Sequence, residues 1–291
     1  MRACLDCLPC LAKNAISLAK KSACGDDALA RRMAESGLKI LAEADLSLPP
    51  PCLARKLIDN ALAECDGAVP DPWKPEKDTS TELAQKLMEH LPEIPGWDPQ
   101  SFESRLRLSV AGNILDFSIY DDLDIAVALE TVATAFTKPV DADALAQLQC
   151  RMDSARSILW IFDNCGEAVF DRLLMEPYRD KLTLAVRGRP AFNDLTRAEL
   201  AASGYPDGYA RGGVVSNDDG VPGVVDATCG ESFAKALKAS DLVVAKGQAN
   251  FETMSDRTDR PIAFLFLAKC PVVCREVGAT PQTIQIILHN F

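Results

Sequence analysis

The amino-acid sequence predicts an α/β protein in which a helical amino-terminal cap precedes a Rossmann-like layer with a mainly parallel sheet. Up to about residue 150, apolar residues recur at the three- and four-residue spacing of amphipathic helices. After residue 156, short β-rich runs alternate with helix-length segments, which is typical of a parallel sheet covered by helices. We therefore expect two domains, a cap of residues 1–150 and an α/β domain of residues 151–291.

The first part of the chain contains six amphipathic segments that we expect to be helices. They cover residues 11–23, 27–46, 52–65, 82–91, 101–114 and 121–136. Two proline-rich stretches, residues 49–51 and 70–75, interrupt the series, as proline does where a helix cannot continue.

The second part contains five runs that we expect to be strands, residues 157–162, 182–186, 241–245, 262–267 and 283–288. Helix-length segments lie between several of them, at residues 167–175, 196–203 and 232–239. Strands connected through helices are normally parallel, so their carboxyl ends should meet at one edge of the sheet.

The composition limits the classes of function. The chain has 291 residues and a formal net charge of -11, which argues against a general surface for nucleic acid or anionic membranes but leaves room for a small basic pocket. The amino-terminal residues reach a charge at once and lack an apolar signal segment, and no apolar stretch is long enough to span a bilayer. With eleven cysteines and no secretion signal, we expect a cytoplasmic protein with reduced thiols.

The most informative segment is the apolar run at 158–162, which ends in Asp163 and Asn164 before Gly166-Glu167 opens an amphipathic helix. Side chains that follow a buried parallel strand face the crevice in which α/β proteins bind ligands. Carboxylate and amide oxygens suit a hard divalent cation, and a helix start suits an anion. This combination indicates a metal-assisted site for a phosphorylated substrate.

Two more predicted strands end in dense polar sequence. The second is followed by Arg187 and, within the next turn, by Asn193 and Asp194. The third is followed by Lys246 and Gly247. If the strands are parallel, all three ends lie on the same edge, where Arg187 and Lys246 would attract the substrate anion.

Each of these residues also has a purely structural interpretation. Asp163 is a good helix N-cap, Asn193-Asp194 is a good turn, and a single lysine at a strand end is usually solvated. For any one residue taken singly, the structural interpretation is at least as good as the functional one. Because three polar strand ends coincide, we favour a functional site for the set as a whole.

The cysteines Cys4, Cys7 and Cys10 are spaced by three residues. No second Cys-x-x-Cys pair accompanies them at zinc-finger spacing, so we favour packing on one helix face over a metal site. Cys165 has no neighbouring histidine, and with only His90 and His289 in the chain a Ser/Cys–His–Asp triad is poorly supported. Walker and Gly-x-Gly-x-x-Gly motifs are absent.

The chain resembles the metal-dependent damage-control phosphatase family, long known as a domain of unknown function, in its prokaryotic Cys-x-x-Cys branch. The resemblance covers almost the whole chain and lies in an ordered set of motifs. These are Cys4-x-x-Cys7, Asp71-Pro-Trp73 with Lys77, Gly112-Asn113-x-x-Asp116-Phe117, Asp163-Asn164-x-Gly166-Glu167, Arg187-Gly-Arg-Pro-x-x-Asn193-Asp194-x-Thr196, Ala245-Lys-Gly-Gln248 with Asn250, and Lys269-Cys-Pro-Val-Val273.

The resemblance implies a helical domain on a three-layer α/β/α domain and hydrolysis of small phosphorylated metabolites, such as sugar phosphates or damaged phosphometabolites. It implies that Asp163, Asn164 and Asp194 hold a divalent cation (Mg²⁺, Mn²⁺, Co²⁺ or Ni²⁺). It further implies a phosphosubstrate pocket lined by Asn113, Asp116, Glu167, Arg187 and Lys246, to which we add Asn193 and Gly247. Ala249 and Phe251 occupy the positions at which we would expect glycine and tyrosine from the family. These two differences affect the expected detail of the contacts with substrate.

We therefore expect a metal-dependent phosphomonoester hydrolase in which Asp163, Glu167 and Lys246 are catalytic. Glu167 or Asp163 would act as general base, or Asp163 would attack phosphorus directly and form an aspartyl-phosphate. Two other hypotheses remain, a carboxyl methyltransferase of the same family and a non-catalytic metal- or nucleotide-binding module with a cysteine cluster as redox sensor. The sequence does not define the oligomeric state.

Overall fold

Five parallel strands and one antiparallel edge strand form the sheet of the computed structural model, which describes residues 1–65, 71–113 and 125–291. The strands are β1 (Ile158–Ile161), β2 (Leu182–Val186), β3 (Val214–Ser216), β4 (Leu242–Lys246), β5 (Ile262–Ala268) and β6 (Thr283–His289). Their order in the sheet is β3-β2-β1-β4-β5-β6, and only β6 pairs antiparallel, with β5. The expected mainly parallel sheet is confirmed.

Side chains on the two faces of the sheet belong to two different hydrophobic clusters, because successive strand residues point to opposite sides. Trp160 and Val244 face a cluster formed with α4 (Lys74–His90), α5 (Phe102–Ala111), α6 (Ile125–Thr137), α7 (Ala142–Ser154) and α8 (Cys165–Met175). Ile161 and Ala245 face a cluster formed with α9 (Glu231–Ala239), α10 (Gln248–Met254) and α11 (Pro271–Val277). The expected three-layer α/β/α arrangement is thus present.

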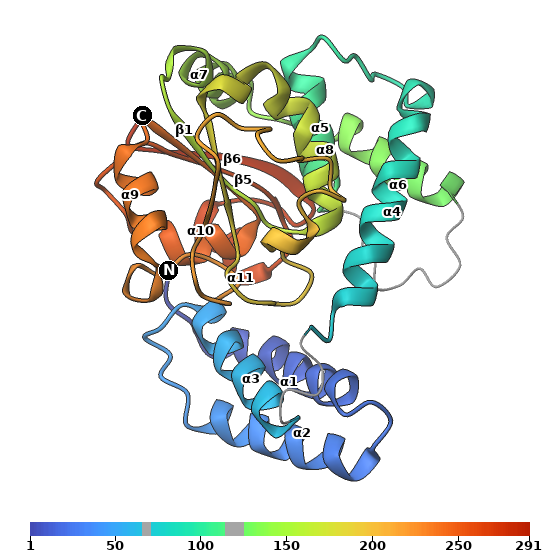
Figure 1. Cartoon of the computed structure of the whole chain (residues 1–291), viewed down its shortest axis with the longest axis vertical. Coiled ribbons are helices and arrows are strands. Elements are labelled where there is room, and N and C mark those ends of the chain that lie inside the picture. Colours follow the sequence, from blue (N-terminus) through green and yellow to red (C-terminus); the bar gives the residue numbers. More distant parts are fainter. Residues whose placement is uncertain (66–70, 114–124) are drawn as a thin grey trace.

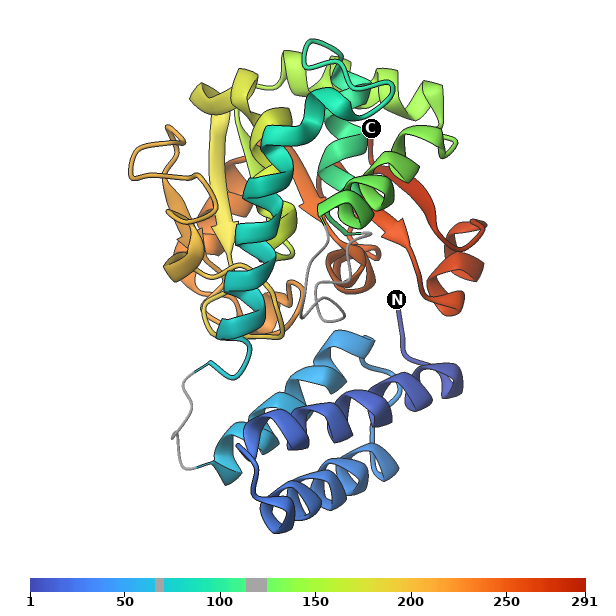
Figure 2. The same ribbon diagram turned by 90° about the vertical axis from the view of Figure 1, so that its right-hand side faces the viewer.

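The first three helices, α1 (Leu8–Ser22), α2 (Asp27–Ala42) and α3 (Pro50–Glu64), pack around a separate cluster that includes Leu57 and Ile58. Figures 1 and 2 show them as a blue bundle beyond one end of the sheet. The helices from α4 onward instead share the cluster on one sheet face. A domain boundary at residue 150 stays a prediction; the clusters group α4 to α7 with the sheet.

Several predicted elements differ from those in the structure. The segment 196–203 does not form an α-helix: only a 3-10 turn (η4, Arg197–Glu199) is present, before Gly204 with a φ of 92° and Pro206. Strand β3 and helices α7, α10 and α11 were not predicted. Asp141 is the N-cap of helix α7, and its carboxylate accepts hydrogen bonds from the backbone N–H groups of Asp143 and Ala144. The predicted helix 121–136 extends beyond the described residues at its start.

Among the described residues, no helix has the length and apolarity needed to cross a membrane.

Candidate active site

The carboxyl ends of β1, β2 and β4 meet at one edge of the sheet, as the strand pattern predicts. β1 lies between the other two, and Ile161 is in register with Ala185 of β2 and with Ala245 of β4. The segments that begin with Asp163 and Arg187 therefore follow neighbouring strands, while Lys246 ends the third strand. Residues distant in sequence are thus brought together at this edge of the sheet.

Asp163, Asn164 and Asp194 lie together just beyond β1. Asn164 and Asp194 form an isolated β-bridge, and the N–H of Leu195 donates to the carbonyl oxygen of Asp163 at 2.8 Å. The side-chain amide of Asn164 donates from Nδ2 to Asp163 Oδ2 at 2.9 Å, which leaves its Oδ1 as the atom suited to a cation. The backbone thus fixes all three residues of the expected metal set beside one another.

Arg187 connects the two aspartates. Its Nε donates to Asp194 Oδ2 at 2.6 Å, and its Nη2 lies 4.0 Å from Asp163 Oδ1. The remaining nitrogen, Nη1, donates to the carbonyl oxygen of Gly223 at 2.9 Å and to Asn250 Oδ1 at 3.2 Å. Arg187 is only 2% exposed, and its Nε holds Asp194, whereas its Nη2 is buried and has no hydrogen-bond partner among the described residues.

Negative charge accumulates at this edge. Burial raises the pKa of Asp163 well above its usual range, and the nearby charges of Asp194 and Glu167 raise it further. Burial also raises the pKa of Asp194, although Arg187 opposes that effect. A bound cation would favour the ionised form of both carboxylates, since an opposite charge stabilises the charged state.

The donor set fits a hard divalent cation. Residues 1–65, 71–113 and 125–291 contain no group of three or more His, Cys, Asp or Glu side chains arranged to hold a metal ion. Two carboxylates and one amide oxygen are available instead, from Asp163, Asp194 and Asn164. Such all-oxygen sites with few protein ligands are typical of Mg²⁺ and chemically similar ions, which keep several waters.

Asn113 and Glu167 form the next layer around Asp163. The amide Nδ2 of Asn113 donates to Glu167 Oε2 at 2.7 Å and to Asp163 Oδ2 at 3.2 Å. This contact depends on the close packing of α5 against α8, because a Cβ on Gly112 would lie 2.6 Å from the Cα of Glu167. Asn113 therefore holds both expected catalytic carboxylates in place.

Lys246 lies differently from the expectation that it meets the substrate phosphate. Its side chain is fully buried, and Nζ donates to Glu167 Oε1 at 2.7 Å, to Ser109 Oγ at 2.8 Å and to the carbonyl oxygen of Ser109 at 3.0 Å. Asp171 on α8 is its second carboxylate partner, and Ser109 Oγ donates to the same Asp171 oxygen. In this structure Lys246 contacts the site through Glu167.

Burial raises the pKa of Asp171 to about 6, while the charge of Lys246 opposes the increase. Its second oxygen, Oδ2, is buried and has no hydrogen-bond partner among the described residues. Asp171 and Ser109 were not singled out from the sequence. The sequence contained a pattern that could have identified Asp171: it follows Glu167 at i+4 on α8 and so lies on the same helix face.

Gly247 packs directly against the carboxylate of Asp163. It has a φ of 79°, in the region that favours glycine, and its N–H donates to the carbonyl oxygen of Leu265 in β5 at 3.0 Å. That N–H is therefore engaged by the sheet, and Gly247 contributes space at the site. The expected site residue Asp116 lies outside the described residues.

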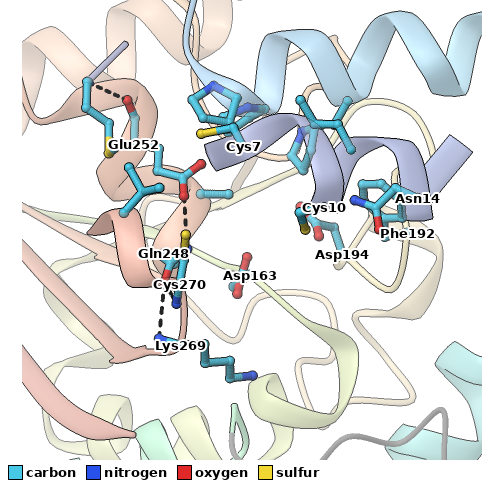
Figure 3. A pocket seen from close by; sticks show the side chains of 18 of the residues that line it. Cys7, Cys10, Asn14, Asp163, Phe192, Asp194, Gln248, Glu252, Lys269 and Cys270 are labelled. Atoms are coloured by element: carbon cyan, nitrogen blue, oxygen red, sulfur yellow. Dashed lines mark hydrogen bonds between the residues drawn. The ribbon is translucent and has the colours of Figure 1, made fainter. Parts of the chain in front are cut away.

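A cavity of about 540 Å³ lies between this edge and the helical bundle (Figure 3). Its floor includes Asn113, Asp163, Asn164, Asn193 and Asp194. Its other walls come from the amino-terminal segment and the bundle, from α10, from the start of α11 and the segment before it, and from the loops that carry Phe192 and Pro222. They are formed by Met1, Asp6, Cys7, Cys10, Leu11, Asn14, Pro50, Pro51, Ala54, Phe192, Pro222, Gln248, Ala249, Glu252, Lys269, Cys270 and Val272. On the protein side of this floor, away from the cavity, lie four further residues that hold it in place: Glu167, Arg187, Lys246 and Gly247.

Helix α10 and the segment after β5 supply cavity residues that the sequence analysis named in motifs or not at all, without assigning them to the site. Gln248 accepts hydrogen bonds from the N–H groups of Lys269 and Cys270 at 3.3 and 3.2 Å, and it donates to Glu252 Oε1 at 2.9 Å. Burial raises the pKa of Glu252 to about 7. Lys269 is the cationic side chain among those that line the described cavity. These residues belong to loops and to a short helix whose position depends on tertiary packing.

A second buried network anchors the segment after β2. Lys77 Nζ lies 2.8 Å from Asp71 Oδ2 and 3.8 Å from Glu199 Oε2. Glu199 in turn accepts from the N–H and Oγ1 of Thr196 at 3.0 and 2.6 Å. The motif residues Asp71, Lys77 and Thr196 thus fix the segment that carries Asp194.

The three amino-terminal cysteines do not share one buried helix face. Cys7 is buried, Cys4 is partly buried, and Cys10 is exposed at the surface while also lining the cavity. Packing therefore accounts for Cys7 and does not account for the whole set.

Comparison with known proteins gives the family. Residues 3–283 match the model of the damage-control phosphatase ARMT1-like domain. The chain belongs to the damage-control phosphatase ARMT1-like family. The match covers nearly the entire chain, so the family resemblance drawn from the motifs is confirmed, and with it the assignment of the chain to the phosphatases.

Archaeal proteins are among the relatives of this family member. It is 32% identical over 260 residues to a damage-control phosphatase of Archaeoglobus fulgidus, covering 87% of this chain and 88% of the relative. It is 31% identical over 293 aligned residues to damage-control phosphatase PH1575 of Pyrococcus horikoshii, covering 98% of both. The crystal structure of PH1575, a DUF89 family protein, matches with a TM-score of 0.87 over 100% of both chains at 27% identity.

Proposed function

We propose that this damage-control phosphatase hydrolyses phosphomonoesters of small metabolites with the help of a divalent cation held by Asp163, Asn164 and Asp194. The observation that carries the proposal is the convergence of these three residues on the floor of one cavity. The family is generally metal-dependent, and Mg²⁺, Mn²⁺, Co²⁺ and Ni²⁺ all suit the oxygen ligands.

The bound cation would polarise the phosphoryl oxygens and lower the pKa of a water. The protein's contribution is to hold the charged groups in fixed geometry. Arg187 holds Asp194, Asn113 holds Asp163 and Glu167, and Lys246 holds Glu167 from the other side. Such preorganised charges act during the reaction without a cost of reorganisation.

Glu167 and Asp163 are the two candidates for proton transfer. Glu167 is fully buried and bonded through both oxygens, to Asn113 and to Lys246. Asp163 lines the cavity and has a raised pKa. We propose Asp163 as the residue closer to the substrate, either as ligand and base or as a nucleophile that forms an aspartyl-phosphate.

The size and lining of the cavity support small phosphorylated metabolites as the substrate class. A volume of about 540 Å³ suits a sugar phosphate or a similarly sized damaged phosphometabolite. Lys269 on the cavity wall is placed to meet a phosphate that enters. We further propose that the protein acts in the cytoplasm, because a chain with eleven cysteines suits a compartment that keeps thiols reduced.

Phosphate release from p-nitrophenyl phosphate and from a panel of sugar phosphates, with Mg²⁺, Mn²⁺, Co²⁺ or Ni²⁺ and with a chelator, tests the proposal. We expect turnover only with a cation, and loss of both turnover and Mn²⁺ binding by calorimetry in Asp163→Asn. Asp207→Asn, a change at an exposed site, is the matched control. Full activity of Asp163→Asn, or equal turnover with chelator, would refute the proposed site.

A further inference from the structure

Two sulfur atoms at the edge of the bundle lie close together. Cys4 precedes a 3-10 turn (η1, Leu5–Cys7) that ends with Cys7, and the N–H of Cys7 donates to the carbonyl oxygen of Cys4 at 3.0 Å. Side chains three residues apart in a 3-10 turn eclipse each other, so the two thiols stack. Their Sγ atoms are 3.8 Å apart.

The two thiols differ in their surroundings. Cys4 is partly exposed, whereas Cys7 is 7% exposed and belongs to the core of the bundle. Burial raises the pKa of the Cys7 thiol to about 11, and the neighbouring thiols of Cys4 and Cys270 add to the increase. A reagent from solvent can therefore reach Cys4 first, with Cys7 held behind it as a protonated second thiol.

The pair is also connected to the active-site cavity. Cys7 lines that cavity together with Cys270, which lies at the start of α11, and with Asp163 and Asp194. Within the described parts of the chain, no three thiols or carboxylates are arranged to hold a metal ion. The arrangement is therefore one of paired sulfurs rather than of a metal cage.

We propose that Cys4 and Cys7 form a reversible dithiol–disulfide site that exchanges with small-molecule disulfides such as oxidised glutathione. The thiolate of Cys4 attacks one sulfur of the small disulfide, forms a mixed disulfide and releases one small thiolate. Cys7 then loses its proton to solvent and attacks Cys4 Sγ, which expels the second small thiolate. The protein loses two electrons and two protons, and one small disulfide is reduced to two thiols.

Closing the bond brings the two sulfur atoms from 3.8 Å to about 2.05 Å. Since Cys7 lines the cavity, this movement changes the wall, while Asp163 and Asp194 on the floor keep their positions beyond the strand ends. We expect oxidation to change KM at least twofold and to leave kcat nearly unchanged. This effect rests on the proposed phosphatase function, whereas the disulfide itself does not.

The chemical test uses the full chain, equilibrated without oxygen in mixtures of oxidised and reduced glutathione and then treated with N-ethylmaleimide. Cleavage on the amino side of Asp6 and Asp26 separates residues 1–5, which contain Cys4, from residues 6–25. We expect these two peptides to be joined by a reducible bond in the wild type, in Cys10→Ser and in Cys24→Ser. They should be separate in Cys4→Ser and in Cys7→Ser.

Two results would overturn the disulfide. One is glutathione on Cys4 without a link to the second peptide, and the other is a link that persists in Cys7→Ser. The kinetic test compares KM for p-nitrophenyl phosphate in the oxidised and reduced protein, with Cys4→Ser as the control that should not respond. An equal KM in both states of an active wild type would overturn the connection to the cavity. A protein without phosphatase activity would instead refute the proposed function and leave the peptide result intact.

Discussion

Gly247 and Asp163 are packed so closely that no other residue fits at position 247 without moving the carboxylate. A Cβ on Gly247 would lie 2.0 Å from Asp163 Oδ2 and 2.1 Å from its Cγ. Asn113 and Asn164 donate hydrogen bonds to the Asp163 carboxylate on its other sides, so the carboxylate cannot move far from Gly247. The position of the carboxylate is therefore set partly by the absence of a side chain at Gly247, directly after the neighbouring strand β4.

We expect Gly247→Ala to lower turnover more than about 100-fold, because a shift of about 1 Å in a catalytic group has effects of that size. Gly208→Ala is the matched control, since Gly208 has a φ of 78° and nothing within 4 Å of its added Cβ. Both variants should lose about 1–3 kcal/mol of stability from the unfavourable backbone conformation, and Gly247→Ala should lose more because its Cβ meets the Asp163 carboxylate. Kinetics and urea unfolding of the two variants separate the effects; equal turnover in both would contradict the proposed contact.

The two aspartates should differ in their effect on stability, although both are needed for activity. Asp194→Asn leaves Arg187 with a weakened buried partner, and removal of one member of a buried pair costs about 3–5 kcal/mol. Asp163→Asn removes a charge that burial disfavours, so the metal-free protein should become more stable. Urea unfolding in chelator measures both changes. A loss of stability in Asp163→Asn would show that the carboxylate is already compensated by the protein.

Lys246→Met should lower kcat and leave KM nearly unchanged, because Lys246 acts on Glu167 without facing the cavity. It should also destabilise the fold, since Glu167 and Asp171 would lose their common cation. Lys238→Met at an exposed position is the control. A large rise in KM with normal kcat would instead place the lysine on the substrate phosphate.

Asp171 should make stability depend on pH. Its folded pKa of about 6 lies above the ordinary value of 3.8, so the folded state retains a proton that the unfolded chain releases between these values. The contribution is fully present below pH 3.8 and is lost as pH rises through about 6. It amounts to about 3 kcal/mol at 1.36 kcal/mol per pKa unit. The difference in unfolding free energy between wild type and Asp171→Asn, measured from pH 4 to pH 7, should fall by most of this amount, because part of the contribution is already lost at pH 4; a constant difference would contradict it.

The sheet edge could be predicted from the sequence because parallel order follows from the alternation of strands and helices. Asp163 and Asp194 were placed correctly for that reason. The direction of Lys246 was missed because the third strand was ended at residue 245. Including it puts Leu242, Val244 and Lys246 on one face of β4, toward α5 and α8. A one-residue error in a strand end thus changed an internal lysine into an expected phosphate ligand.

The cavity walls could not be predicted, because they come from contacts between segments far apart in the chain. Cys7 and Cys270 share a wall although 263 residues separate them (270 − 7), and no local pattern encodes that contact. Strand β3 has only three residues and follows Gly212 and Gly213, so its pattern is too short to distinguish from a loop. The positions of the cavity walls and of β3 depend on packing against the rest of the folded protein rather than on their own local sequence.

The close packing of the carboxylates of Asp163, Glu167 and Asp194 also affects the lifetime of the protein against proteolysis. These carboxylates are buried around two cations, Arg187 and Lys246. The excess negative charge lowers the free energy of unfolding whenever the proposed metal is absent. A cation at 100 times its Kd would add about 2.7 kcal/mol to the free energy of unfolding. Under metal starvation a larger fraction of molecules would unfold and meet proteases, so the abundance of the protein would follow the supply of its metal.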